Sequence, residues 1–169
     1  MNLLHKVKCL HLNRLFPISF HHLNQKNIAM ANELYFESTY GTVSFDTELQ
    51  ANLMIWTTPP SSREFREGMN KLADQINERG VADILTDTTH LGAIDPDDQV
   101  WSATTWTDRI TKVSGRRKLA LILPEEIFTQ ISVADTMAMV QDAVEMKYFS
   151  SLQEAKAWVK IKESKIVAA

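Results

Sequence analysis

The sequence is poor in cysteine, because Cys9 is the one thiol among 169 residues. A lone thiol cannot close an internal disulfide, and it offers neither a CxxC pair nor a zinc-binding pattern. Such a chain suits a reducing compartment, so we expect a cytoplasmic protein. Long apolar runs are also missing. The longest, such as Leu119–Leu123, fall far short of the roughly 20 residues that a membrane-spanning helix needs, and the sequence predicts no membrane span.

Basic residues are fewer than acidic residues, and they show little clustering. The 18 lysines and arginines stand against 21 acidic residues, and the one basic cluster is Arg116-Arg117-Lys118. This charge balance argues against nucleic acid as the main partner. The five glycines are widely scattered, which excludes a glycine-rich phosphate loop. A chain with 44% hydrophobic and 23% charged residues is typical of a globular protein with one core.

The first 32 residues differ in character from the remainder. The first acidic residue is Glu33, and four of the five histidines precede it, whereas the remainder holds 14 basic and 21 acidic residues. A secretory signal fits poorly because its apolar stretch is interrupted, and a transit peptide fits poorly because arginine and serine are scarce. We therefore interpret residues 1–32 as a leader or disordered extension, with Met30 as an alternative true start. Its histidines have no ordered elements to hold them, so we expect no metal site.

Removal of this leader should leave folding intact, because residues 1–29 show no hydrophobic periodicity and no capping signal. A chain that begins at Met30 should keep the melting temperature of the full chain, measured by circular dichroism. A melting temperature lower by several degrees would show that the leader packs on the domain.

Residues 33–163 have the pattern of a single α/β domain, followed by a tail over 164–169. Three short alternating segments predict an antiparallel meander: Tyr35–Ser38, Thr42–Asp46 and Leu49–Trp56. Helices and apolar strands then alternate: a helix from Ser61 to Gly80, a strand over Ala82–Thr86, a helix from Asp95, a strand over Lys118–Leu123, a helix capped by Ser132, a strand over Lys147–Phe149 and a helix from Ser151. This order predicts a mixed sheet with an antiparallel N-terminal meander followed by βαβ units, with helices covering the sheet.

Capping signals and apolar stripes mark the expected helices. Ser61 and Glu64 form a capping box, Gly80 ends that helix, and Asp95 with Pro96 starts the next one. The buried stripe of the second helix is Trp106, Ile110 and Val113, and that of the third is Val133, Met137, Val140 and Val144. The four tryptophans could line a pocket, but core positions are the more frequent role of such residues.

An aspartate and a histidine follow the strand predicted over Ala82–Thr86. Asp87 ends a predicted parallel strand and His90 follows it, at the strand end where α/β folds place ligand sites. His90 is the one histidine of the folded part, which has no cysteine, so no conventional catalytic set is present. The sequence thus predicts a non-enzymatic protein.

The second helix opens with Asp95, Asp97 and Asp98. A calcium loop starting there would need glycine at Val100 and a bidentate glutamate at Trp106, so an EF-hand is excluded. Helix capping explains the same carboxylates without a metal. The candidate binding residues are therefore Asp87, His90, Asp95, Asp97 and Asp98, with no metal and no cofactor expected.

The segment Ile84–Asp98 resembles the strand, loop and helix start of STAS (SpoIIAA-like) domains. Their pattern is Asp-Leu-Ser, five residues, then Asp-Ser-Ser-Gly; Asp87 and Asp95 match its two aspartates. Asp97 takes the second serine position, which is the phosphorylation switch of regulatory members, and Asp98 takes the glycine position. The resemblance therefore implies a site that phosphorylation cannot switch, with a permanent negative charge in place of the phosphate.

A wider resemblance covers Tyr35 to Lys162 and links the chain to an uncharacterised bacterial group of STAS/SEC14-like proteins. It is carried by a Tyr-Phe-Glu-Ser start, an Asp-Gln-x-Trp segment at Asp98, a Leu-Pro strand end at Leu123 and a Tyr-Phe-x-Ser-x-x-Glu-Ala-x-x-Trp end at Tyr148–Trp158. The resemblance implies a non-enzymatic binding or regulatory module that acts through a protein partner or self-association. The alternative that it implies is a SEC14-like carrier of a small apolar or lipid-like ligand.

Overall fold

The computed structural model describes residues 32–113, 117–140 and 144–161. Within these ranges lies a six-stranded sheet in the order β1-β2-β3-β4-β5-β6. The strands are β1 (Asn32–Glu37), β2 (Gly41–Asp46), β3 (Ala51–Trp56), β4 (Ile84–Asp87), β5 (Lys118–Ile122) and β6 (Glu145–Phe149). Strands β1 to β3 pair antiparallel and β3 to β6 pair parallel, which confirms the predicted mixed sheet. The expected leader, apart from Asn32, and the tail over 164–169 lie outside the described residues.

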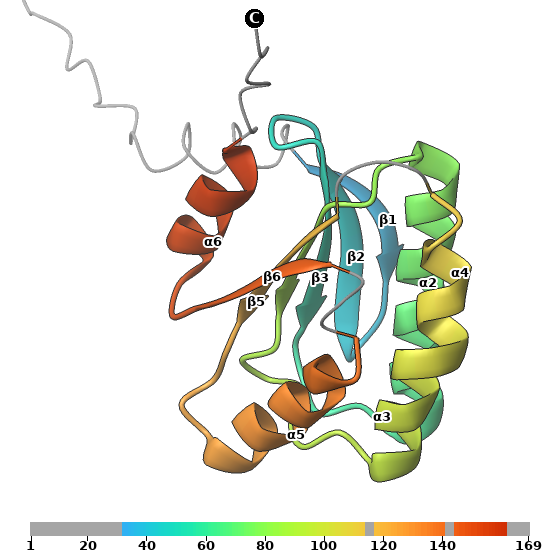
Figure 1. Ribbon diagram of the computed structural model, residues 1–169, viewed down its shortest axis with the longest axis vertical. Coiled ribbons are helices and arrows are strands. Elements are labelled where there is room, and N and C mark those ends of the chain that lie inside the picture. Colours follow the sequence, from blue (N-terminus) through green and yellow to red (C-terminus); the bar gives the residue numbers. More distant parts are fainter. Residues whose placement is uncertain (1–31, 114–116, 141–143, 162–169) are drawn as a thin grey trace, which may run out of the picture. The chain divides into compact units, whose positions relative to one another are not determined.

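Helices cover both faces of the sheet (Figure 1). They are α2 (Ser62–Arg79), α3 (Pro96–Trp101), the π-helical turn η1 (Ser102–Trp106), α4 (Thr107–Ile110), α5 (Ile127–Ala138) and α6 (Leu152–Lys160). Residues of α2, η1, α4 and α5 share one core with Met54 of β3, whereas α6 packs on the other face with Leu53. Neighbouring residues of β3 thus enter different cores, because successive side chains of a strand point to opposite faces.

Helix α2 begins and ends where the local signals predict. The Glu64 carboxylate accepts a hydrogen bond from the Ser61 backbone N–H at 2.8 Å and another from the Ser61 hydroxyl, which together hold the pKa of Glu64 below its usual value. At the other end, Gly80 adopts the left-handed conformation (φ 65°), and its N–H donates to the Ile76 carbonyl. A left-handed helix end favours glycine, which has no Cβ.

The helix predicted to start at Asp95 is interrupted by a π-helical turn that the sequence pattern did not indicate. Residues Ser102–Trp106 form η1 between α3 and α4. The Ser102 hydroxyl donates to the Asp98 carbonyl and the Thr107 hydroxyl donates to the Ser102 carbonyl, so side chains stabilise the widened turn. The predicted buried stripe is confirmed nevertheless, since Trp106, Ile110 and Val113 are all buried.

Helix α5 starts earlier than predicted, and the expectation that Ser132 caps it is wrong. The N-cap is Glu126, whose carboxylate accepts hydrogen bonds from the backbone N–H groups of Phe128 (2.8 Å) and Thr129 (2.7 Å). These bonds hold the pKa of Glu126 below its usual value. Ser132 instead lies buried within the helix. The predicted stripe holds for Val133 and Met137, which pack in the core. The helix ends at Ala138, so Val140 and Val144 do not continue the stripe, and Val144 directly precedes β6.

Candidate functional site

The loop after β4 is fixed to the sheet at its base and exposed at its tip. Thr88 is buried, and its backbone N–H (3.0 Å) and hydroxyl (2.7 Å) both donate to the Ile122 carbonyl of β5. The half-buried Asp87 accepts a hydrogen bond from the Thr89 backbone N–H at 2.9 Å. His90 follows and is exposed. The loop therefore presents His90 at the carboxyl end of the parallel strands, where the sequence predicted it.

Asp95 is the N-cap of α3, as predicted. Its carboxylate accepts a hydrogen bond from the Asp97 backbone N–H at 2.9 Å, and Pro96 occupies the first helical turn. Gln99 adds a second tie between helix and loop, since its side-chain amide donates to the Ile94 carbonyl. Asp97 is exposed on this first turn, where a negative charge is favourable because the helix dipole is positive there.

Asp98 differs from its two acidic neighbours. Its side chain is only 3% exposed, and Oδ1 accepts hydrogen bonds from the Ser62 hydroxyl (2.9 Å) and from Arg66 Nε (2.5 Å). The Arg66 guanidinium also lies over the Trp101 ring, 5.3 Å from its centroid. Asp98 thus joins the start of α3 to the start of α2.

The structure therefore brings the candidate residues to one edge of the sheet but divides them into two groups. Asp87, His90, Asp95 and Asp97 lie on the outer side of the loop and helix entrance, whereas Asp98 is buried between two helices. Sequence reasoning did not find the partners of Asp98, because Ser62 and Arg66 lie more than 30 positions earlier. Over the described ranges, His, Cys, Asp and Glu form no group of three that could hold a metal ion.

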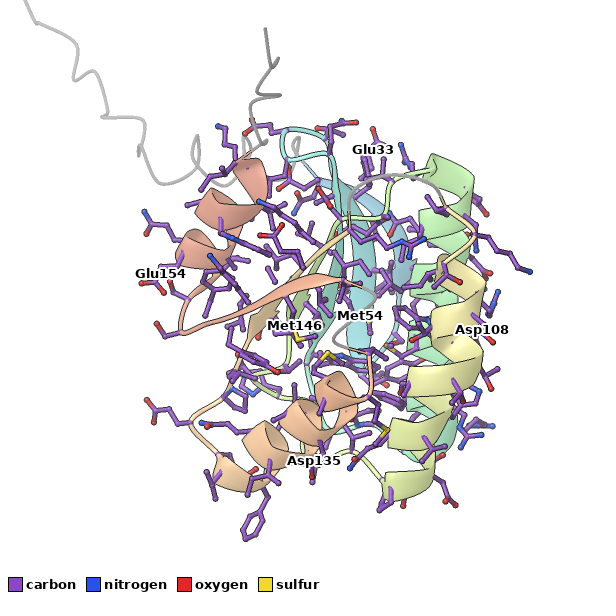
Figure 2. All side chains as sticks on the ribbon, in the orientation of Figure 1. Glu33, Met54, Asp108, Asp135, Met146 and Glu154 are labelled. Carbon is purple, nitrogen blue, oxygen red and sulfur yellow. The ribbon has the colours of Figure 1, made fainter. Side chains whose placement is uncertain are left out.

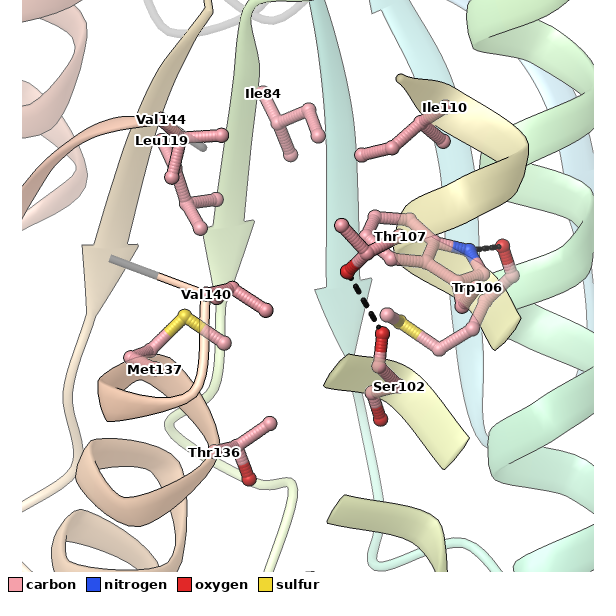
Figure 3. Close-up of a pocket in the computed structure, with 11 residues that line it drawn as sticks. Ile84, Ser102, Trp106, Thr107, Ile110, Leu119, Thr136, Met137, Val140 and Val144 are labelled. Atoms are coloured by element: carbon pink, nitrogen blue, oxygen red, sulfur yellow. Dashed lines mark hydrogen bonds between the residues drawn. The ribbon is translucent and has the colours of Figure 1, made fainter. Parts of the chain in front are cut away.

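Two adjoining apolar cavities lie between the sheet and the helices that cover this face, and Figure 3 shows the residues that line one of them. Their volumes are about 40 Å³ and 60 Å³. Both are lined by Met69, Ser102, Thr136 and Met137, and Trp106 borders the smaller one. A cavity that holds one benzene molecule has a volume of roughly 150 Å³, so the two cavities together are too small for an apolar ligand of that size.

Tryptophans contribute to the core rather than to an open site. Trp56, Trp106 and Trp158 are buried, and Trp56 stacks on Phe65 with ring centroids 5.5 Å apart. Trp101 is half-buried beneath Arg66. The sequence-based preference for core positions is therefore confirmed for three of the four.

This geometry defines a mixed-sheet α/β domain with an exposed acidic helix entrance at the carboxyl edge of its parallel strands. The family model of SpoIIAA-like domains matches residues 55–160, and the chain belongs to the SpoIIAA-like family. Domains of this kind are in general non-catalytic regulatory or binding modules that interact with proteins. No curated protein and no solved structure matches the chain. Among the described helices, none has the length and apolar character to cross a bilayer.

Proposed function

We propose that this chain is a non-enzymatic regulatory module of the cytoplasm that binds a protein partner, or a second copy of itself, through the entrance of α3. One observation carries the proposal: Asp97 is exposed between two acidic residues that serve the fold. Asp95 caps α3 and Asp98 pairs with Arg66. Asp97 therefore remains as the carboxylate of this helix entrance that is available to a partner.

The proposed contact is constitutive. Asp97 occupies the position at which regulatory relatives carry the switchable serine, so phosphorylation cannot alter the charge there. A carboxylate has one negative charge, whereas a phosphoserine has nearly two and offers three strong acceptor oxygens. We infer a partner that reads a permanent carboxylate, with a lysine or arginine opposite Asp97.

Carriage of a small apolar or lipid-like ligand is the second candidate function. The apolar lining of the two cavities favours it, whereas their volumes oppose it unless α5 moves away from the sheet. Native mass spectrometry of the purified full chain separates the two functions. A co-purified small molecule would support a carrier, a bound protein partner or a dimer would support the binding module, and the mass of the bare chain would support neither.

The two exposed aspartates of the helix entrance should separate stability from binding. Asp95→Ala should lower the free energy of unfolding by about 0.5–2 kcal/mol, because the variant loses the N-cap. Asp97→Asn should change it by no more than about 0.5 kcal/mol, as exposed substitutions usually do. Urea denaturation of both variants measures this contrast.

Affinity for the partner should be affected more by Asp97→Asn than by Asp95→Ala, the reverse of the effect on stability. Once a partner has been isolated by pull-down and purified, or self-association has been measured by sedimentation, Asp97→Asn should weaken the complex and added salt should do the same. Normal binding by Asp97→Asn, together with a loss in Asp95→Ala alone, would mean that this loop is only a helix cap.

A further inference from the structure

Helix α5 buries mostly hydroxyl residues and exposes three large apolar residues. Its buried residues are Thr129, Ser132, Val133 and Thr136, so three of the four are hydroxyl residues. Its solvent side holds Ile127, Phe128 and Ile131, which are 55%, 70% and 50% exposed. A surface helix normally has the opposite arrangement, with apolar residues toward the core.

The buried hydroxyl groups of α5 donate hydrogen bonds to groups three or four residues earlier in the chain. The Thr136 hydroxyl donates to the Ser132 carbonyl (2.8 Å), and the Thr129 hydroxyl donates to Glu126 (2.7 Å). Ser132 donates to the Thr129 carbonyl and accepts from the Ile94 backbone N–H, both at 3.0 Å. The inner side thus packs on the core through Val133 and Met137 and satisfies its own hydroxyl groups. Folding of the domain therefore does not explain the exposed apolar residues of the outer side.

We call Ile127, Phe128 and Ile131 the outer face of α5. Ile127 and Ile131 are one helical turn apart, so their side chains are neighbours on the helix surface. The sequence contains no lysine or arginine from Leu119 to Met146. Acidic residues do occur near the face, since Glu125 and Glu126 precede it and Asp135 is exposed on the next turn.

A hollow of about 380 Å³ lies beside the start of α5 and is lined by Glu125, Gln130 of α5 and Tyr148 of β6. Tyr148 is partly exposed there, and partial burial raises the pKa of its hydroxyl. A hollow of this size can accept a side chain from a molecule that lies along the helix. Leu123 and Phe149 add apolar lining, and the carboxylate of Glu125 adds negative charge.

We propose that the outer face of α5 is a docking surface for a cationic amphipathic helix of a partner protein. Charge decides the occupant, because an apolar face whose charged neighbours along the chain are all acidic fits a helix with one apolar side and flanking lysines or arginines. Direct pairing of two α5 faces would bring like charges together, and an anionic membrane surface would be repelled.

This surface deepens the proposed function by adding a second protein contact, whose chemistry is defined. The Ile94 backbone N–H donates to the Ser132 hydroxyl, so the loop before α3 is joined to the inner side of α5. The inference rests on the proposed function only in that both concern protein contacts. Each is tested through its own residue, Asp97 for the helix entrance and Phe128 for the outer face.

The test uses the purified full chain and a fluorescent 18-residue peptide of leucine and lysine with helical amphipathic spacing. Fluorescence anisotropy should show binding that Phe128→Ser weakens about tenfold or more, because an exposed aromatic anchor is lost. Asp135→Lys should weaken it about threefold or more at low salt. Matched controls are Leu34→Ser, an exposed apolar residue of β1, and Asp108→Lys, the same charge change on α4 (Figure 2).

Several outcomes would overturn the inference. These are equal binding of a peptide with glutamate in place of lysine, equal losses in the two controls, or unchanged affinity in Phe128→Ser at an unchanged melting temperature. A dimer by light scattering that Phe128→Ser abolishes would assign the face to a second copy. Phe128-dependent capture by phosphatidylglycerol vesicles would assign it to a membrane. Loss of peptide binding in Asp97→Asn alone would leave the helix entrance as a contact and remove the α5 face.

Discussion

Truncation of Trp106 to alanine is expected to lower the free energy of unfolding by about 3–5 kcal/mol, the cost typical of removing a large buried aromatic residue. Trp106 is only 8% exposed and belongs to the core formed by α2, η1 and α4 on the sheet. Its indole N–H donates to the Met69 carbonyl of α2, so the substitution also removes a hydrogen bond between elements. Urea denaturation monitored by circular dichroism measures the loss.

A cavity already lies next to Trp106, and its enlargement also contributes to the expected loss of stability. Removal of the indole would enlarge that cavity rather than open a new one, because Met69, Ile110 and Met137 also line it. Trp101→Ala is the matched control, since Trp101 belongs to the same helical segment but is half-buried, and its loss should be smaller. Unchanged stability in Trp106→Ala, together with loss of ligand or partner binding, would show that Trp106 serves a binding site instead of the core.

Helix α2 is the part of the fold that local rules specified best. The predicted start at Ser61 and end at Gly80 agree with the structure, because each end is determined by groups within four residues of it. The parallel strands β4 and β5 were also recognisable in the sequence, since both are covered on both faces, β5 is mostly apolar and β4 begins with two apolar residues. Local capping and burial therefore account for most of the architecture.

The start of helix α5 was not predicted correctly by local rules. A serine followed by an apolar stripe suggested a cap at Ser132, yet a serine within a helix can also satisfy its hydroxyl through a backbone carbonyl one turn earlier. A carboxylate two residues after Pro124 provides the actual cap. Both residues could cap a helix locally, and the buried Ser132 also accepts a hydrogen bond from the distant Ile94 backbone N–H, which no local pattern contains.

The candidate site was predictable in its place but not in the division of its residues. Strand ends and caps located Asp87, His90, Asp95 and Asp97 at the carboxyl edge of the sheet. The burial of Asp98 depends on Ser62 and Arg66 of another helix, and the three acidic residues look equivalent in the sequence. The spacing of charges along a chain does not reveal which of them meets a distant arginine.

The contrast between Asp98 and Asp97 should consequently be large although the two residues are adjacent. Asp98→Ala should lower the free energy of unfolding by about 2–3 kcal/mol, because it removes two hydrogen bonds to a buried carboxylate. The Arg66 side chain is 39% exposed and can regain water, so the loss stays below the roughly 3–5 kcal/mol of a fully buried pair. Asp97→Asn, with an expected change of at most about 0.5 kcal/mol, is the neighbouring control.

A double-mutant cycle tests whether the Asp98–Arg66 pair itself produces the loss. Arg66→Met should also destabilise the domain, because it leaves Asp98 buried without its cation. The double variant should then be less destabilised than the sum of the single variants, with a coupling of about 0.5–3 kcal/mol, as expected for residues in direct contact. Additive losses in urea denaturation would mean that the two side chains act independently, and that Ser62 alone anchors Asp98 to α2.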